Sequence, residues 1–395
     1  MNEARRLRVL LAPDSFKGSL TSVQVARCLA SGWSRVRPID ELVLAPLADG
    51  GEGTLSAIAE AGGWEWQECP AHDALGRPLT ARWLRSLDGE RGAVELAEAS
   101  GLSRLPVDEP RAPLAATTEG TGEILRAVLD AGVRHVVMGV GGSATTDGGS
   151  GLLHALGASY RGGSLEPFPG PVPNLASVDL AGLDERLTDL QLRVACDVTN
   201  PLLGEQGAAA VYALQKGAWP EDIAKLEAWL AHYADLLEAA SGVLAREKPG
   251  AGAAGGTGFG LMSLAPRLRS FDLIPGVELV MQETGFDSRL AAADLVITGE
   301  GQVDAQTAFG KTALGVARRA EAAGVPCLAV GGGVTAEGAA VLAAHGSVAV
   351  PVLDRPMTLR DAMAKAAPLV TSAGERLARL VALGALVADR QGSPA

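Results

Sequence analysis

The chain contains few residues of the kinds that mark a disulfide framework, a zinc centre or a redox site. It has four cysteines in 395 residues, and no two of them have the C-x-x-C spacing. The five histidines show no zinc-ligand spacing either. These absences exclude a disulfide scaffold and argue against a structural zinc. We expect the cysteines to be buried, reduced thiols.

Positive charge and long apolar runs are also scarce. The chain has 34 Lys and Arg residues against 46 Asp and Glu residues, a net charge of −12, which argues against a nucleic-acid surface. The first apolar run, 9–12, is too short for a signal peptide, and no run is long enough to cross a membrane. We therefore expect a cytoplasmic protein without nucleic-acid or membrane partners. A small anionic substrate remains compatible, since a local loop can bind an anion on an acidic protein.

Glycine, in contrast, is abundant. The 50 glycines fall mostly at the ends of apolar runs, as in proteins with many tight strand–helix connections. Strand–loop–helix units recur at both ends of the chain, and 63–113 has the shorter alternating runs of antiparallel strands. The sequence therefore predicts an α/β protein with a discontinuous domain, 1–75 with 290–395, and an inserted α/β domain, 76–289.

The most conspicuous motif follows the apolar run 136–140, which predicts a buried strand. A polar loop, 141–149, comes next, and helical spacing resumes at Leu152. Strand, glycine-rich loop and helix together direct backbone N–H groups at an anion. We therefore predict contacts to phosphate or substrate from four loop residues: Gly141, Gly142, Ser143 and Asp147. An ordinary tight connection between strand and helix is the alternative.

Two similar loops follow the first two predicted strands. Asp14, Ser15 and Lys17 come after the strand 8–12, at the end where open α/β sheets bind ligands. An exposed loop lysine is the alternative for Lys17. The second loop contains two acids among glycines, which favour a helix dipole or bind a metal or a substrate hydroxyl. Its candidate residues are Asp49, Gly50, Gly51 and Glu52.

Two polar turns in the middle of the chain are further candidates. Asp197 and Asn200 follow the predicted buried strand 192–196. Gln215 and Lys216 form a second turn after an apolar segment, and we expect both to bind substrate or nucleotide. The glycines in 249–260 match the dinucleotide fingerprint formally, but no strand precedes them, so we reject a Rossmann site there and expect a flexible lid or hinge near a ligand.

Near the C-terminus, the predicted strand 293–298 runs into a glycine turn with Glu300 and Asp304, followed by Lys311. This is not a Walker A motif, because Ala305 stands where that motif needs its first glycine. A lysine at a helix start with two acids before it still suits phosphate and Mg²⁺. We assign Glu300 and Asp304 to the metal and Lys311 to phosphate; two ordinary helix-start acids are the alternative.

These polar loops combine carboxylates, lysines and glycines, the residue types that phosphoryl transfer requires. Six of them also resemble, in order and nearly end to end, the motifs of the glycerate kinase type 1 family. The matching segments are 12–17, 48–54, 139–149, 197–202, 215–218 and 298–311. Gln302 is a departure, since the family usually has arginine there.

The resemblance implies ATP- and Mg²⁺-dependent phosphorylation of D-glycerate, usually giving 2-phosphoglycerate. It also implies a Rossmann-like three-layer domain, a second α/β domain and an active site in the cleft between them. A homodimer is an open option. No glycine fingerprint follows a strand, so a dehydrogenase is excluded. A non-enzymatic phosphate or hydroxy-acid binding protein is the alternative function.

Within this reaction we expect three catalytic residues. Asp197 is the predicted base for the glycerate hydroxyl, because a buried strand positions it rigidly. Asn200 is expected to bind the glycerate carboxylate from the same turn. Lys17 is expected to contact the transferred phosphate, and Asp49 is the third catalytic candidate. Asp49 and Asp147 are the rival bases, and Asp197 as a simple loop cap is the alternative.

Overall fold

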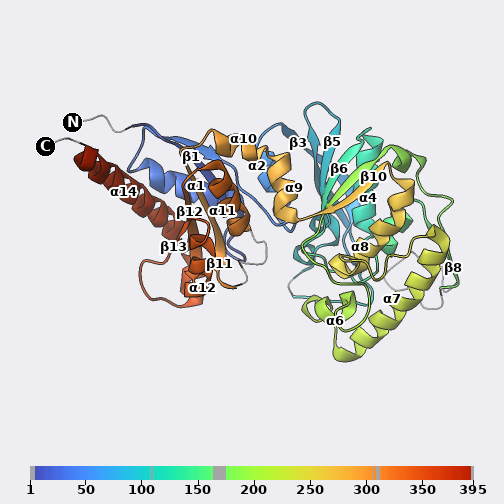
Figure 1. Cartoon of the computed structure of the whole chain (residues 1–395). Coiled ribbons are helices and arrows are strands. Elements are labelled where there is room, and N and C mark those ends of the chain that lie inside the picture. Colours follow the sequence, from blue (N-terminus) through green and yellow to red (C-terminus); the bar gives the residue numbers. More distant parts are fainter. Residues whose placement is uncertain are drawn as a thin grey trace. The chain divides into compact units, whose positions relative to one another are not determined.

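The computed structural model describes residues 5–106, 108–109, 111–162, 175–305, 307 and 312–392, and the side chains up to residue 387 (Figure 1). The chain forms two compact units. The first contains Met1–Asp49, Ser56–Gly62 and Val280–Ala395, and the second contains Gly50–Leu55 and Gly63–Leu279. The domain boundaries at residues 75 and 290 stay a prediction.

Helices and strands alternate along the first unit. Its elements are β1 (Arg8–Pro13), α1 (Ser22–Ser34), β2 (Glu41–Leu44), α10 (Phe286–Ala291), β11 (Leu295–Val303), α11 (Thr312–Ala323), β12 (Cys327–Val334), α12 (Ala336–Ala343), β13 (Val348–Pro351), α13 (Leu359–Ala364) and α14 (Ala366–Gly392). Two helices contain residues of both units: α2 (Thr54–Glu60) and α9 (Gly276–Glu283).

The second unit contains strands, α-helices and short 3₁₀ helices. Its strands are β3 (Trp64–His72), β4 (Pro78–Ser86), β5 (Arg91–Glu95), β6 (His135–Gly139), β7 (Ser159–Arg161), β8 (Ser177–Asp179), β9 (Gln191–Ala195) and β10 (Ser270–Ile274). Its α-helices are α3 (Ala97–Ser100), α4 (Glu119–Asp130), α5 (Ser150–Ala155), α6 (Ala208–Tyr212), α7 (Pro220–Ser241) and α8 (Ala253–Leu264). Its 3₁₀ helices are η1 (Leu102–Arg104), η2 (Glu185–Asp189), η3 (Leu214–Lys216) and η4 (Ala265–Arg267).

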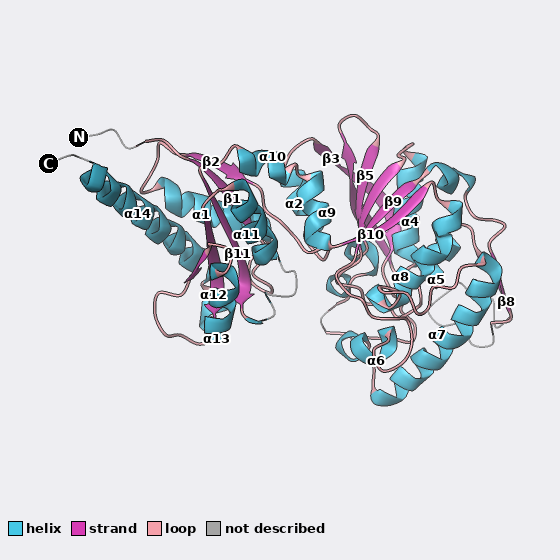
Figure 2. Ribbon diagram, viewed as in Figure 1, coloured by secondary structure: helices cyan, strands magenta, loops and turns pink. Residues whose placement is uncertain are grey.

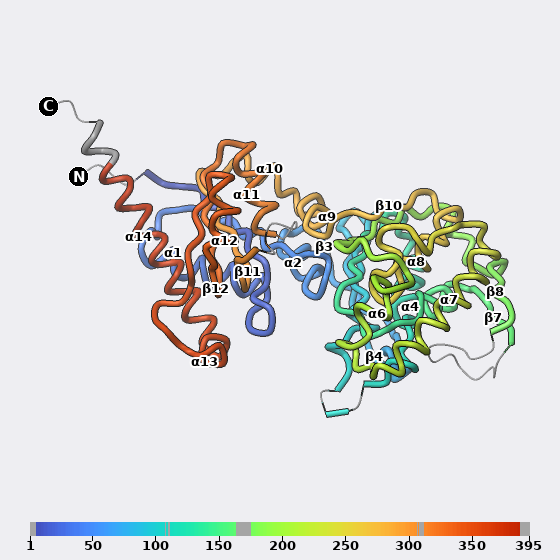
Figure 3. Tube along the Cα trace, turned by 60° about the horizontal axis from the view of Figure 1, so that its bottom comes forward, coloured from blue at the N-terminus to red at the C-terminus, as the bar shows by residue number. Residues whose placement is uncertain are grey.

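The sheet of the first unit is parallel throughout, in the order β13-β12-β11-β1-β2. Alternate residues of β1 point to opposite faces, and Val9 and Leu11 pack with Leu29 of α1 and Val370 of α14 in one apolar core. Helices α1 and α14, far apart in the sequence, therefore lie side by side (Figures 1 and 3). A capping box starts α1: the side chain of Thr21 accepts a hydrogen bond from the backbone N–H of Gln24, and the Gln24 side chain accepts one from the backbone N–H of Thr21.

The strand order of this sheet reverses beside β1. The chain passes from β1 to β2 on one side and then returns to β11 on the other side, from where it continues outward to β12 and β13. In a doubly wound sheet of this order, the carboxyl ends of the two strands at the reversal form a crevice where ligands bind. The residues that follow β1 and β11 are therefore the first place to look for a site in this unit.

The second unit has a six-stranded sheet in the order β10-β9-β6-β5-β4-β3 (Figure 2). Strands β5, β6, β9 and β10 are parallel, and β3 and β4 add an antiparallel edge, as the alternating runs in 63–113 predict. The predicted α/β class is thus confirmed in both units. Among the described residues, no helix combines the length and the apolar character needed to cross a bilayer.

Candidate functional site

Asp14 follows β1 directly, at the strand-order reversal of the first unit. Its backbone N–H donates to the carbonyl of Gly299 in β11 at 2.7 Å. Its carboxylate accepts hydrogen bonds from the Ser15 N–H and from the Thr312 hydroxyl, both at 2.5 Å. Asp14 and Ser15 therefore lie at the end of the sheet where the sequence predicts a ligand.

Two further carboxylates, those of Asp49 and Glu300, act on Asp14 at this end of the sheet. Burial, followed by repulsion from Asp49 and then from Glu300, raises the pKa of Asp14 to about 7, although two hydrogen bonds act in the opposite direction. A bound cation would relieve this repulsion, and hard carboxylate oxygens suit Mg²⁺. Among the residues that the structure describes, no three His, Cys, Asp or Glu side chains form a metal-binding group by themselves.

The two acids predicted to hold the metal lie in a different local structure from the expected one. The predicted glycine turn after residue 298 is wrong, because β11 continues to Val303 and contains Glu300. A Cβ atom at Gly299 would lie 2.5 Å from the Val330 carbonyl oxygen of β12, so glycine at this position lets the strand continue. The hydroxyl of Thr307 donates to Glu300 at 2.6 Å and accepts from the N–H of Asp304 at 3.1 Å, so this hydroxyl links the two acids.

Lys17 lies in a closed loop after Asp14. The loop is closed by the antiparallel bridge between Phe16 and Leu20, with the Phe16 N–H donating to the Leu20 carbonyl at 2.8 Å. The Lys17 side chain is exposed, so it is available to a phosphate group and equally consistent with an ordinary exposed lysine. Lys311, the other predicted phosphate ligand, lies outside the described residues.

In the second unit, the buried carboxylate of Asp147 holds two helix starts together. It accepts hydrogen bonds from the N–H and the hydroxyl of Thr118, each at 2.8 Å, next to the start of α4. It also accepts from the N–H groups of Gly149 and Gly151 at the start of α5, each at 3.1 Å. The protein's own carboxylate therefore occupies the place at α5 where the sequence predicts a substrate anion.

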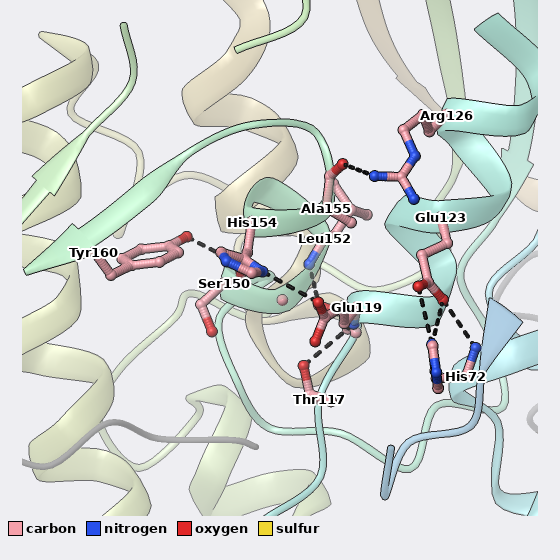
Figure 4. A network of polar contacts seen from close by, with 12 residues as sticks. His72, Thr117, Glu119, Glu123, Arg126, Ser150, Leu152, His154, Ala155 and Tyr160 are labelled. Atoms are coloured by element: carbon pink, nitrogen blue, oxygen red, sulfur yellow. Dashed lines mark hydrogen bonds and ion pairs between the residues drawn. The ribbon is translucent and has the colours of Figure 1, made fainter. Parts of the chain in front are cut away.

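Further polar contacts tie α4 to its neighbours, as Figure 4 shows. Glu119 of α4 contacts Nδ1 of His154 in α5 at 3.1 Å, and this contact raises the pKa of His154. Glu123, one turn further along, accepts from the backbone N–H of His72 at 2.8 Å. The hydroxyl of Tyr160 donates to the carbonyl of Ser150 at 2.8 Å. The segment around Asp147 is thus part of a rigid framework.

The other half of the same loop, residues 141–143, has a different environment. Gly141 donates its N–H to the Gly50 carbonyl at 3.2 Å, and a Cβ atom at Gly141 would lie 2.5 Å from the Cα of Gly51. The two predicted glycine segments therefore pack backbone to backbone. Gly142 is exposed and Ser143 is 6% exposed, so this half of the loop is the part that a ligand can reach.

Lys216 lies beneath this loop and is 3% exposed. Its Nζ donates to the Ser143 hydroxyl at 2.8 Å and to the Thr145 carbonyl at 2.6 Å. Burial lowers the pKa of Lys216 to about 7, and the nearby charge of Asp147 opposes that effect. The predicted binding lysine thus contacts the glycine-rich loop, whereas its neighbour Gln215 is exposed and uses its backbone carbonyl to accept a hydrogen bond from Arg111.

Asp197 and Asn200 follow β9, as expected. The exposed carboxylate of Asp197 accepts from the N–H of Gly276, the first residue of α9, at 2.8 Å, which fixes its orientation. The side-chain amide of Asn200 forms two hydrogen bonds within the same unit. Its oxygen accepts from the Tyr212 hydroxyl at 2.7 Å, and its nitrogen donates to the Gln206 carbonyl at 2.8 Å. Asn200 therefore shapes the turn, and its predicted contact to a glycerate carboxylate stays a prediction.

Glu95, the last residue of β5, is a buried acid that the sequence analysis did not include among the candidate residues. It is buried, and its carboxylate accepts from the N–H of Leu55 at 3.0 Å near the start of α2. Burial is the main cause that raises the pKa of Glu95 to about 7, and repulsion from Glu98 and the exposed Glu52 adds to it. Its position after the apolar residues of β5 was the available signal.

Of the two interpretations of 249–260, the flexible lid is wrong, and a hinge near a ligand stays a prediction. Most of this segment starts the buried helix α8, where Ala254 and the two glycines after it have left-handed backbone angles. A Cβ atom at Gly255 would lie 1.9 Å from the Thr145 carbonyl, and one at Gly260 would lie 2.7 Å from the Gly148 carbonyl. These glycines let α8 pack directly on the polar loop after β6.

Comparison with known proteins agrees with this architecture. The model of the glycerate kinase family matches residues 9–382. The glycerate kinase of Bacillus subtilis is 40% identical over 95% of this chain and 97% of its own length. The glycerate 2-kinase of Escherichia coli is 38% identical over 96% of this chain and 99% of its own length.

A solved structure gives the same result for the fold. The crystal structure of a Salmonella typhimurium LT2 protein assigned to glycerate kinase 2 aligns with a TM-score of 0.80. The alignment covers 97% of this chain and all of the other chain, at 38% sequence identity. With a family match over nearly the whole sequence and relatives at this identity, the chain belongs to the glycerate kinase family of enzymes.

Proposed function

We propose that this enzyme uses ATP and Mg²⁺ to phosphorylate the 2-hydroxyl of D-glycerate, forming 2-phosphoglycerate and ADP. The names of the curated relatives support glycerate as the substrate. The structural observation that carries the proposal is the set of carboxylates around Asp14 at the strand-order reversal of the first unit. Carboxylates that repel Asp14 at the carboxyl end of a doubly wound sheet, where ligands bind, suit a cation that accompanies a nucleotide. A non-enzymatic binding protein would not need this group.

The first unit is proposed to handle the nucleotide. Glu300 and Asp304 would hold Mg²⁺, linked as they are through the Thr307 hydroxyl. When bound, Mg²⁺ neutralises charge on the phosphate oxygens. Lys17 and Lys311 would contact phosphate as point charges.

The second unit is proposed to handle glycerate. Asp197 would accept the proton of the hydroxyl, and its bond from Gly276 holds its carboxylate in one orientation. Gly142 is exposed in the loop after β6, and Gly142 and Ser143 would contact the anionic groups of the substrate. Asp147 is a weaker candidate for the base, because four donors already surround its buried carboxylate.

A substrate panel tests this function. The protein is incubated with ATP, Mg²⁺ and, in turn, D-glycerate, L-glycerate, lactate and tartronate, and ADP release is followed. We expect rapid ADP release with D-glycerate and much slower release with L-glycerate, which presents its 2-hydroxyl in the opposite configuration. ADP release that does not depend on any hydroxy acid, or a preference for another acid over D-glycerate, would reject the proposal. The same proposal places the enzyme in the cytoplasm.

A further inference from the structure

Lys216 is buried although it carries an amine, and its contacts show what it does there. The side chain is 3% exposed, and two of the three donor positions of an ammonium are used on one loop, by the Ser143 hydroxyl at 2.8 Å and the Thr145 carbonyl at 2.6 Å. Burying an amine in this way costs free energy unless its partners compensate. The compensating partners lie in the loop after β6, so Lys216 and that loop form one structural group.

The backbone of the same loop is held from the other side. The N–H of Ala144 donates to the Ser100 carbonyl at 2.9 Å, and the N–H of Leu102 donates to the Gly142 carbonyl at 2.9 Å. Ser143 lies between these two bonds and forms an antiparallel bridge with Gly101. The Ser143 backbone is therefore fixed. The direction of its O–H bond can still rotate about the Cβ–Oγ bond, so a hydrogen-bonding partner can set it.

An ammonium donor decides which way this hydroxyl points. When Nζ of Lys216 donates to the Ser143 oxygen, the Ser143 hydrogen turns away from the lysine and is free to be donated elsewhere. The residue before Ser143, Gly142, is exposed, so this is the side from which an anion would approach the loop. The ammonium also polarises the O–H bond and strengthens it as a donor.

We propose that Lys216 is a positioning residue that acts through Ser143: it turns the Ser143 hydroxyl outward as a hydrogen-bond donor to an anionic oxygen of the substrate, the glycerate carboxylate. This inference rests on the proposed function. It changes the predicted role of Lys216 from direct contact with substrate or nucleotide to support of a residue that makes the contact. The other hydrogen bond of Nζ, to the Thr145 carbonyl, holds the lysine side chain against the loop.

A double-mutant cycle tests the proposal. Lys216→Met, Ser143→Ala and the double variant are compared with wild type for KM of D-glycerate, KM of ATP and kcat. Because both single variants remove the same substrate contact, we expect each to raise KM for D-glycerate by about tenfold, the usual size for a hydrogen bond to a charged group. The double variant should be no worse than either single variant, and KM for ATP should stay within twofold.

The matched control is Lys225→Met. Lys225 belongs to the same unit, is 61% exposed and pairs with Asp222 at 3.3 Å. We expect its kinetic constants to equal those of wild type. Thermal unfolding of each variant shows whether a kinetic loss comes from loss of folded protein.

Several outcomes overturn the proposal. Additive effects of the two single variants would mean that Lys216 acts independently of Ser143, and a selective rise in KM for ATP would place the contact on phosphate. If Lys216→Met does not fold, an unchanged KM for D-glycerate in Ser143→Ala overturns it alone. If wild type shows no turnover, the proposed function fails separately, and calorimetric titration of D-glycerate into wild type and Ser143→Ala still tests the Ser143 contact.

Discussion

Three aspartates in loops after buried parallel strands have different surroundings. Asp147 is buried and accepts hydrogen bonds from four donors. Asp197 is exposed and oriented by one backbone N–H, and Asp14 faces the charges of two further acids. From the sequence all three look alike, since each is an acid among small residues after an apolar run. Their different roles depend on partners that are distant in the chain, which spacing cannot reveal.

Asp14→Asn should show the cost of charge at the strand-order reversal. The folded protein holds the Asp14 proton up to a pKa of about 7, against an ordinary 3.8, so its stability falls as pH rises through that window. Asparagine has no such loss. We expect the difference in unfolding free energy, variant minus wild type, to rise by about 2–3 kcal/mol from pH 5 to pH 8. Thermal or urea unfolding without Mg²⁺ measures it, and a difference that is independent of pH would show that Asp14 is not perturbed.

The three candidate bases can be separated by two readouts. Asp197→Asn should lower kcat far more than it raises KM, because it removes an interaction made mainly in the transition state. It should cost only about 1 kcal/mol of stability through its bond to α9. Asp147→Asn should instead destabilise the protein by about 2–4 kcal/mol, since an amide cannot accept from all four donors. If Asp197→Asn keeps kcat within a few fold of wild type, the base is Asp49 or Asp147, and Asp49→Asn decides between them.

At the scale of elements, the sequence predicts those helices and strands whose form depends on contacts between residues close together in the chain. The capping box at Thr21 and the antiparallel strands in 63–113 are visible in the sequence and are present in the structure. The continuation of β11 past residue 298 and the burial of α8 were not predicted. Both depend on close approach to distant backbone, β12 in one case and the loop after β6 in the other. A glycine that permits such packing cannot be told from a glycine in a turn without knowing the neighbour.

Gly141→Ala should test the backbone contact between the two glycine segments of the second unit. The new Cβ would lie 2.5 Å from the Cα of Gly51, so the backbone must shift, and we expect a loss of about 1–3 kcal/mol. Gly384→Ala on the exposed part of α14 is the matched control. A Cβ atom at Gly384 would meet no atom of another described segment within 4 Å, so this change should gain up to about 1 kcal/mol from helix propensity. Equal effects of the two changes in urea unfolding would contradict the packing argument.

At the scale of the whole molecule, both ends of the chain contribute to one doubly wound sheet, and the middle of the chain forms the other. The recurrence of strand–loop–helix units at both ends was the signal for this arrangement. The predicted boundaries near 75 and 290 rested on changes of pattern, which locate strands better than they locate domains. Of the candidate site residues, the structure brings Asp49 and Glu300 close enough to raise the pKa of Asp14 in the first unit, and Ser143 and Lys216 into contact in the second.

The central claim, transfer of phosphate from ATP to the 2-hydroxyl of D-glycerate, is tested most directly by ³¹P NMR of one reaction mixture. The mixture contains the protein, ATP, Mg²⁺ and D-glycerate. We predict that a phosphomonoester signal grows as ADP forms, and that it is a doublet in the proton-coupled spectrum, since phosphate on C2 couples to a single proton on that carbon. A triplet would place the phosphate on the CH₂ of C3. If ADP forms and free phosphate is the only new signal besides ADP, with no phosphomonoester, the claim is contradicted altogether.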